Sequence, residues 1–81
     1  MLDELSQAKR VVGLKQTVRS IQENDVKKVF LAKDVSPNIY DKIVSLCSEK
    51  NIEVEYADTM KQLGNICKID VPAAVAAILN S

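Results

Sequence analysis

The run Val29–Ala32, with the sequence VFLA, most constrains the fold that this chain can adopt. A short apolar run without a polar position is typical of a strand that is buried on both faces, as in sheets covered by helices. Segments with helical periodicity flank the run on both sides. This alternation predicts an α/β fold, a three-layer α/β/α sandwich around a small mixed sheet of about four strands.

Periodicity and capping residues predict the remaining elements. Helices are expected over residues 3–10, residues 15–23, a segment from Pro37 to a carboxyl cap at Asn51, and a segment opened by a capping box at residues 59–62. Strands are expected at residues 11–14, residues 29–32 and, with the alternation of an edge strand, residues 52–56. The alanine-rich residues 73–79 fit a helix or a buried strand, and the helix–strand alternation elsewhere favours the strand.

The length and composition exclude several classes of protein. Residues 1–81 are enough for one domain, so a single domain is expected. The chain has no histidine, no carboxylate pair at a catalytic spacing and no GxSxG, P-loop or GxGxxG motif, which indicates that it is not an enzyme. Cys47 and Cys67 form no CxxC pair, so we expect core positions, with no metal and no cofactor.

No apolar run approaches the roughly 20 residues that span a bilayer, and the acidic amino terminus does not resemble a signal peptide. We therefore expect a cytoplasmic protein without a membrane partner.

The stretch from Gly13 to Arg19, GLKQTVR, is the best candidate for a binding site. It places a glycine before a helix whose first turns carry Lys15, Gln16 and Arg19, close to the positive end of the helix dipole. These residue types hydrogen-bond to phosphates and base edges, which suggests RNA or DNA binding. The alternative is an ordinary solvated helix face.

The formal net charge of zero argues against indiscriminate nucleic-acid binding. However, residues 1–40 hold seven Lys/Arg against five Asp/Glu, and residues 41–81 hold four against six. A local basic face in the first half remains compatible with recognition of one RNA shape.

Four segments together resemble motifs of one family, the L-seven-Ae ribosomal proteins. The stretch GLKQTVR is similar to that family's helix start Gly-Thr-Asn-Glu-Thr-Thr-Lys, and residues 31–37, LAKDVSP, are similar to its Ile-Ala-Glu-Asp-x-x-Pro turn. Leu46-Cys47 and the segment KQLG at residues 61–64 match its Leu-Cys and Lys-x-x-Leu-Gly elements. The likeness runs from Ser6 to Leu79, and it is strongest to the small bacterial YbxF-type members, which have Lys-Gln where archaeal members have Asn-Glu.

The resemblance implies a monomeric, non-catalytic protein that binds and stabilises kink-turn RNA, a bent helix with sheared G·A pairs beside a bulge. Its target would be a ribosomal RNA, a riboswitch or a messenger leader, and the ribosome is a further possible partner. The contacts would come from the start of the second helix and from the loop before the fourth helix. The residues implied are Gly13, Lys15, Gln16, Arg19, Lys33, Asp58, Thr59, Met60 and Gly64.

Several of these positions have a second interpretation. The same fold could serve as a protein–protein interaction module without RNA. Met60 fits either a contact to an extruded base or a staple on the core. Gly64 fits either the edge of the binding site, which we favour, or a close packing contact. Asp34 is expected to accept local backbone N–H groups rather than to bind RNA.

Two predictions concern residues outside the site. The three aromatic residues, Phe30, Tyr40 and Tyr56, are expected in the core, where they could not stack on bases. Lys27-Lys28 is expected to be a solvated turn.

Overall fold

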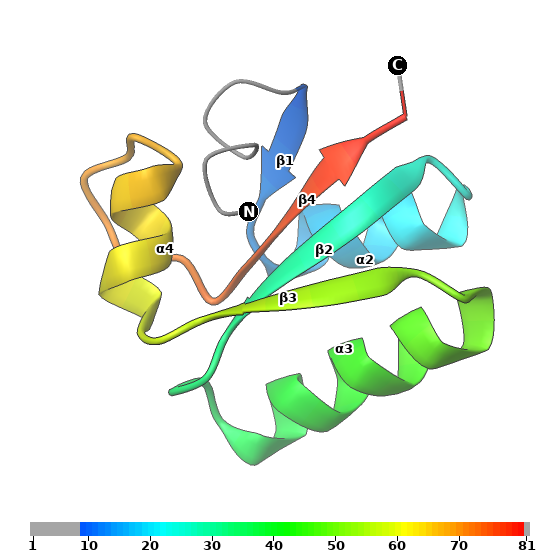
Figure 1. Cartoon of the computed structure of the whole chain (residues 1–81), viewed down its shortest axis with the longest axis horizontal. Coiled ribbons are helices and arrows are strands. Elements are labelled where there is room, and N and C mark those ends of the chain that lie inside the picture. Colours follow the sequence, from blue (N-terminus) through cyan, green and yellow to red (C-terminus); the bar gives the residue numbers. More distant parts are fainter. Residues whose placement is uncertain (1–8, 81) are drawn as a thin grey trace.

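The computed structural model describes residues 9–80, which form a four-stranded sheet with helices packed on it (Figure 1). In chain order the elements are β1 (Arg10–Val12), α2 (Leu14–Gln22), β2 (Val26–Ala32), α3 (Pro37–Lys50), β3 (Glu53–Ala57), α4 (Met60–Ile66) and β4 (Val75–Leu79). The predicted helix over residues 3–10 lies outside the described residues except at its end, where the prediction is wrong because Arg10 already belongs to β1.

The sheet has the strand order β1-β4-β2-β3 and is mixed. Strand β2 pairs parallel with β3 and antiparallel with β4, and β1 pairs antiparallel with β4. The run Val29–Ala32 is fully buried, as predicted, because β2 lies between two strands and under helices. The choice of a strand for residues 73–79 is confirmed, since β4 is a central strand.

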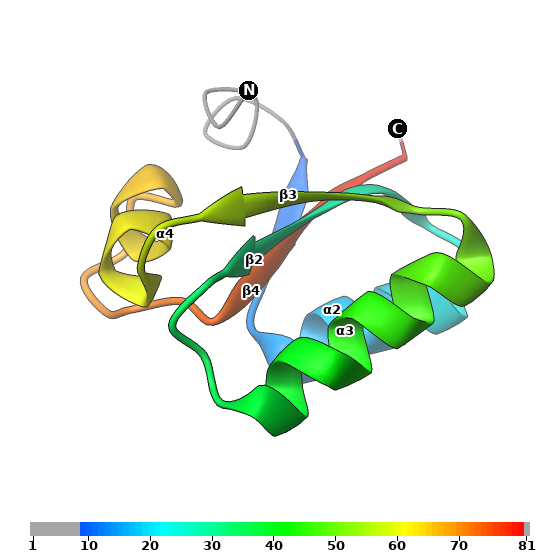
Figure 2. The same cartoon turned by 60° about the horizontal axis from the view of Figure 1, so that its bottom comes forward.

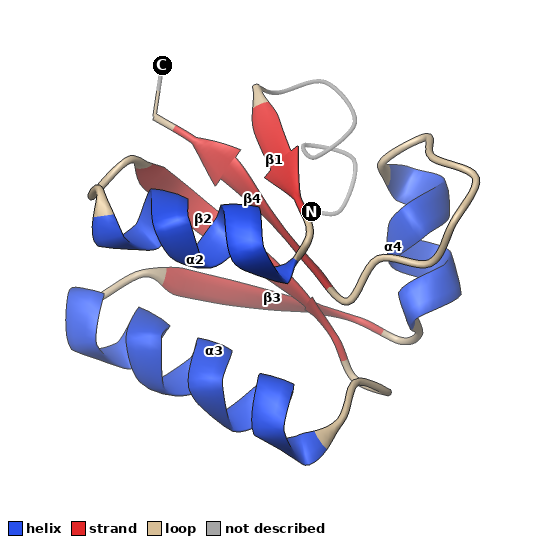
Figure 3. Cartoon of the chain, turned by 180° about the vertical axis from the view of Figure 1, so that it is seen from behind, coloured by secondary structure: helices blue, strands red, loops and turns tan. Residues whose placement is uncertain are grey.

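Helices cover both faces of the sheet, as the α/β/α prediction required. Helices α2 and α3 lie side by side on one face (Figures 2 and 3). Helix α4 reaches the other face, where Arg10 of β1 donates from its guanidinium to the carbonyl oxygen of Cys67 at 2.6 Å. Cys67 ends α4, so this bond satisfies a carbonyl that the helix leaves without an internal partner.

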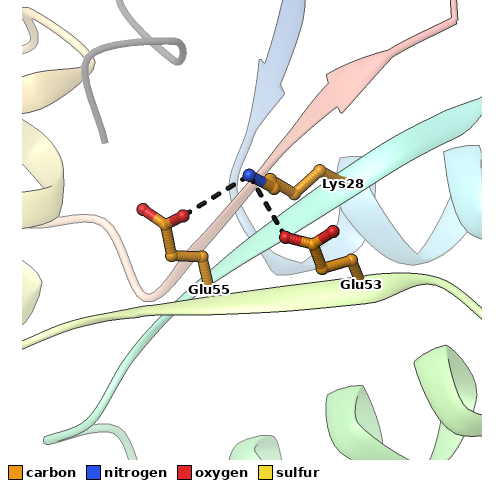
Figure 4. A network of polar contacts seen from close by, with 3 residues as sticks. All are labelled: Lys28, Glu53 and Glu55. Carbon is orange, nitrogen blue, oxygen red and sulfur yellow. Dashed lines mark hydrogen bonds and ion pairs between the residues drawn. The ribbon is translucent and has the colours of Figure 1, made fainter. Parts of the chain in front are cut away.

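The prediction of a solvated turn at Lys27-Lys28 is wrong, because both residues belong to β2. The Lys28 ammonium lies 3.3 Å from a carboxylate oxygen of Glu53 and 3.4 Å from one of Glu55, both on the neighbouring strand β3 (Figure 4). It also lies 5.7 Å from the centre of the Phe30 ring. Two carboxylates and an aromatic face allow this lysine to be half-buried in a strand.

The prediction that all three aromatic residues are core residues holds for Phe30, which is fully buried, and is wrong for Tyr56. Tyr56 is 37% exposed because β3 is an edge strand. Its ring stacks on that of Tyr40 from α3, with the ring centres 6.0 Å apart. This contact covers one face of Tyr56, so it offers at most a partial platform for a base.

The expected helix caps are present. The Thr59 hydroxyl accepts the backbone N–H of Gln62 at 3.0 Å, which confirms Thr59 as the cap and forms one half of the predicted capping box of α4. The Gln62 side chain accepts the backbone N–H of Asp58 at 2.8 Å. Asn51 ends α3 with a φ of 58°, the left-handed conformation that asparagine tolerates at this position.

Both cysteines are buried, as predicted. Burial raises the pKa of the Cys47 thiol to about 11 and also raises the pKa of Cys67. Both side chains therefore act as small apolar residues at neutral pH.

Within residues 9–80, one buried polar side-chain atom has no hydrogen-bond partner. The Thr17 hydroxyl on α2 is fully buried, and no hydrogen-bond partner reaches it. We expect Thr17→Val to raise the free energy of unfolding by about 1 kcal/mol, because valine keeps the shape and removes the desolvated hydroxyl. Urea denaturation of both proteins measures the difference, and a less stable Thr17→Val protein would show that the hydroxyl has a partner in solution.

Candidate nucleic-acid interface

The start of α2 and the loops after β2, β3 and α4 meet at one end of the sheet. Backbone hydrogen bonds join these segments. The N–H of Gly13 donates to the carbonyl oxygen of Val75 at 2.8 Å, and the N–H of Ala32 donates to the carbonyl oxygen of Ala74 at 3.0 Å. The N–H of Ala73 donates to Met60 at 3.0 Å. We call this end the start edge, formed by residues 13–16, 33–34, 58–60 and 70–74.

The apolar spacing of Leu14, Val18 and Ile21 predicts that these three residues face the core and that Lys15 and Gln16 face solvent. The prediction holds for Lys15 and Gln16, which are exposed, and for Ile21, which is buried. It is wrong in part, because Leu14 and Val18 are only partly buried and the other buried residues of α2 are Thr17 and Ser20.

Gly13 precedes the helix with φ 106° and ψ 154°, a conformation that residues with a Cβ atom rarely adopt. The side-chain oxygen of Gln16 lies 3.1 Å from the point where such a Cβ would sit. The glycine therefore lets Gln16 fold back over the first turn of the helix.

Positive potential from the backbone concentrates at the start edge. Helices α2 and α4 begin within the start edge, α3 begins three residues after Asp34, and none of the three has an acidic residue in its first turn. The unpaired N–H groups and the dipoles of α2 and α3 favour an anion in front of them. The only acidic partner of the α2 cations within residues 9–80 is Glu23, whose carboxylate lies 3.6 Å from the Arg19 guanidinium. Both side chains are exposed, so this pair is weak.

The structure brings Lys33 and Asp58 together. Their charged groups lie 3.6 Å apart, and both side chains are exposed. An exposed ion pair of this kind contributes little to the stability of the fold and breaks readily, so the Lys33 ammonium is able to leave Asp58 and contact a phosphate. Asp34 accepts a backbone N–H, as predicted, but from Met60 at 2.8 Å and not from its own turn. This bond ties the loop after β2 to the start of α4.

Gly64 lies beneath the start edge and not on its surface. It is buried, and a Cβ at this position would meet the carbonyl oxygen of Val71 and lie 3.2 Å from the Cα of Pro72. The contact favours the packing interpretation of Gly64, in which the missing side chain lets the loop approach α4. Direct contact of Gly64 with RNA stays a prediction.

Sequence reasoning missed Val71, which follows α4 and is 62% exposed. Most large apolar side chains between residues 9 and 80 are at least partly buried, so this exposure at the start edge is unusual. The nearest sequence signal is the Val-Pro pair in the loop between α4 and β4. It indicates an extended segment but not which way the side chain points.

Across the described residues, no three His, Cys, Asp or Glu side chains lie close enough together to hold a metal ion. None of the helices in that part of the chain has the length and apolar character needed to cross a membrane.

Comparisons with known proteins agree with this arrangement. A family model described as the ribosomal protein L7Ae/L30e/S12e/Gadd45 family matches residues 2–81. An RNA-binding protein of Caldanaerobacter subterraneus subsp. tengcongensis is 49% identical over 69 residues, which cover 85% of this chain and 84% of that protein. The RNA-binding protein YbxF of Geobacillus stearothermophilus is 41% identical over 75 residues, which cover 93% of this chain and 92% of YbxF.

A solved structure, that of the Giardia lamblia 15.5kD RNA binding protein, superposes with a TM-score of 0.87. The superposition covers 99% of this chain and 71% of that one, and the two sequences are 22% identical. At this identity the likeness supports the fold alone.

Proposed function

Because the chain belongs to the ribosomal protein L7Ae/L30e/S12e/Gadd45 family, we propose that it is a non-catalytic RNA-binding protein that stabilises kink-turn RNA. Free RNA of this kind exchanges between extended and bent forms. A protein that binds the bent form more tightly than the extended form shifts the population toward the bent form, and the ratio of the two affinities limits the size of the shift.

The observation that carries the proposal is the exposed start of α2. Lys15 and Gln16 project from a helix end that has no acidic residue, beside a glycine that leaves room for close approach. Lys15 donates to guanine O6 or N7, and Gln16 both donates to and accepts from a purine edge. Arg19, one turn later, holds a phosphate.

A second contact comes from the rest of the start edge. Exposed Val71 and the part of Met60 that does not pack against the core supply apolar surface for an extruded base of the bulge, and Asp58 and Thr59 lie in the loop before α4. Lys33 supplies a phosphate contact when it leaves Asp58. Gly64 acts on this surface indirectly, because its lack of a side chain lets the loop that carries Val71 pack against α4.

In this proposal residues 1–81 act as one domain and bind RNA as a monomer in the cytoplasm. Kink-turns in ribosomal RNA, in riboswitches and in messenger leaders present the same bend, so each is a candidate target, and the ribosome is a candidate site of action.

A gel shift with two RNAs tests the proposal. We expect the protein to bind a kink-turn RNA at least tenfold more tightly than the same RNA with its sheared G·A pairs replaced by Watson–Crick pairs, because loss of two purine-edge contacts costs roughly 1–3 kcal/mol each. Equal affinity for both RNAs, or no binding at micromolar protein, would contradict it. The latter result would favour a protein–protein interaction module with the same fold.

A further inference from the structure

The two helices on one face of the sheet enclose a groove, and only two of its lining residues, Lys15 and Arg19, take part in the proposed contacts. Helices α2 and α3 run alongside each other with both amino-terminal ends toward the start edge (Figure 3). The groove has a volume of about 480 Å³ and is lined by Leu14, Lys15, Val18, Arg19, Gln22 and Lys42. Lys15 lines the groove and also belongs to the start edge, so the two surfaces adjoin.

The lining combines an apolar floor with a cationic rim. Leu14 and Val18 form the floor, and both are only partly buried. The charged residues that line the groove are all cations, from α2 and, in the case of Lys42, from α3. Within the described part of the chain, no carboxylate pairs with Lys15 or Lys42. An apolar floor with unpaired cations above it fits the flat face of a base or ribose together with its phosphate.

We infer that the groove between α2 and α3 binds a nucleotide of the RNA strand that leaves the start of α2, with the phosphate on Lys42. This inference rests on the proposed function and extends it by a site on α3. Continuity decides the occupant: Lys15 and Arg19 carry the proposed RNA contacts and also line the groove. Between Lys15 and Lys42, the charged residues that line the groove are all cations, so an RNA strand held at Lys15 can continue to Lys42. A different partner would compete with the RNA for Lys15 and Arg19.

Two lysine variants on α3 test the inference. Lys42→Gln removes the charge in the groove, and Lys50→Gln removes the same charge from the last turn of the same helix, roughly 12 Å further along. Both residues are exposed, so both variants should melt at nearly the native temperature. The measurement is the affinity for one kink-turn RNA at several salt concentrations.

We expect Lys42→Gln to weaken binding roughly five- to tenfold near 0.1 M salt, with the slope of log K against log salt smaller by about 0.7–0.9, as loss of one phosphate contact requires. Lys50→Gln should leave both quantities nearly unchanged. If the two variants behave alike while the native protein still selects the kink-turn RNA, the inference is wrong and the proposed function stands. If the native protein does not select that RNA, both are wrong.

A competition experiment separates RNA from a protein partner. A glutamate-rich amphipathic peptide should fail to bind the protein once the kink-turn RNA is bound, because the strand already fills the groove. Binding of that peptide to the RNA-loaded native protein, lost in Lys42→Gln, would overturn the inference, since the groove would then be free in the complex.

Discussion

The Gly64→Ala protein is expected to be less stable than the native protein by roughly 1–3 kcal/mol. The added methyl group would meet the carbonyl oxygen of Val71 and would lie 3.2 Å from the Cα of Pro72. Both neighbours are backbone atoms, which cannot rotate away as a side chain can. The loop must therefore move away from α4, and the contacts around the buried residues Leu63 and Cys67 loosen with it.

Urea denaturation measures this loss, and Asn65→Ala supplies the matched control. Asn65 is the next residue of α4 and is exposed, so the same helix receives an alanine without a clash. We expect the control to be as stable as the native protein or slightly more stable, because alanine favours helix. If Gly64→Ala is as stable as the native protein, the loop after α4 moves away from the added methyl group without lowering the free energy of unfolding, and the prediction is wrong.

The same substitution should also weaken RNA binding if Val71 contacts the bulge. A loop that moves away from α4 carries Val71 with it, so the apolar surface beside Met60 changes shape. Binding measured far below the denaturation midpoint separates this effect from unfolding.

Sequence periodicity predicted the structure correctly where the buried residues of a helix or strand follow a regular spacing. The alternation of helices and strands placed β4 correctly, although its alanines also favour a helix. The spacing of Leu14, Val18 and Ile21 correctly predicted that Ile21 is buried and that Lys15 and Gln16 are exposed, although Leu14 and Val18 are only partly buried. These features depend on neighbours within one element, so one segment of sequence contains the information.

The errors occur where a residue's surroundings come from distant parts of the chain. Lys28 was assigned to a solvated turn because the sequence does not show that Glu53 and Glu55 lie on the adjacent strand. The close contact between Gly64 and Val71 depends on how the loop returns, and the loop has no periodicity to indicate it. The exposure of Val71 escaped prediction for the same reason.

The Lys15→Ala and Gln16→Ala proteins are each expected to lose roughly 1–3 kcal/mol of binding free energy for kink-turn RNA, and the double variant more than either. Both side chains are exposed at the start of α2, so neither substitution creates a cavity and the melting temperature should remain native. The two losses should differ in kind. Lys15→Ala removes a charge and should reduce the salt dependence of binding, whereas Gln16→Ala removes a neutral hydrogen-bonding group and should leave it nearly unchanged.

Lys27→Ala is the matched control for Lys15. Lys27 is also exposed, but it lies near the start of β2, at the opposite end of that strand from Ala32 and the start edge. If RNA only preferred positive charge in general, Lys15→Ala and Lys27→Ala would weaken RNA binding equally. Recognition at the start of α2 instead predicts a loss for Lys15→Ala alone, and it predicts that the Gln16→Ala loss disappears on RNA without the sheared G·A pairs. Persistence of that loss on the altered RNA would place Gln16 against the phosphate backbone and not against the purine edges.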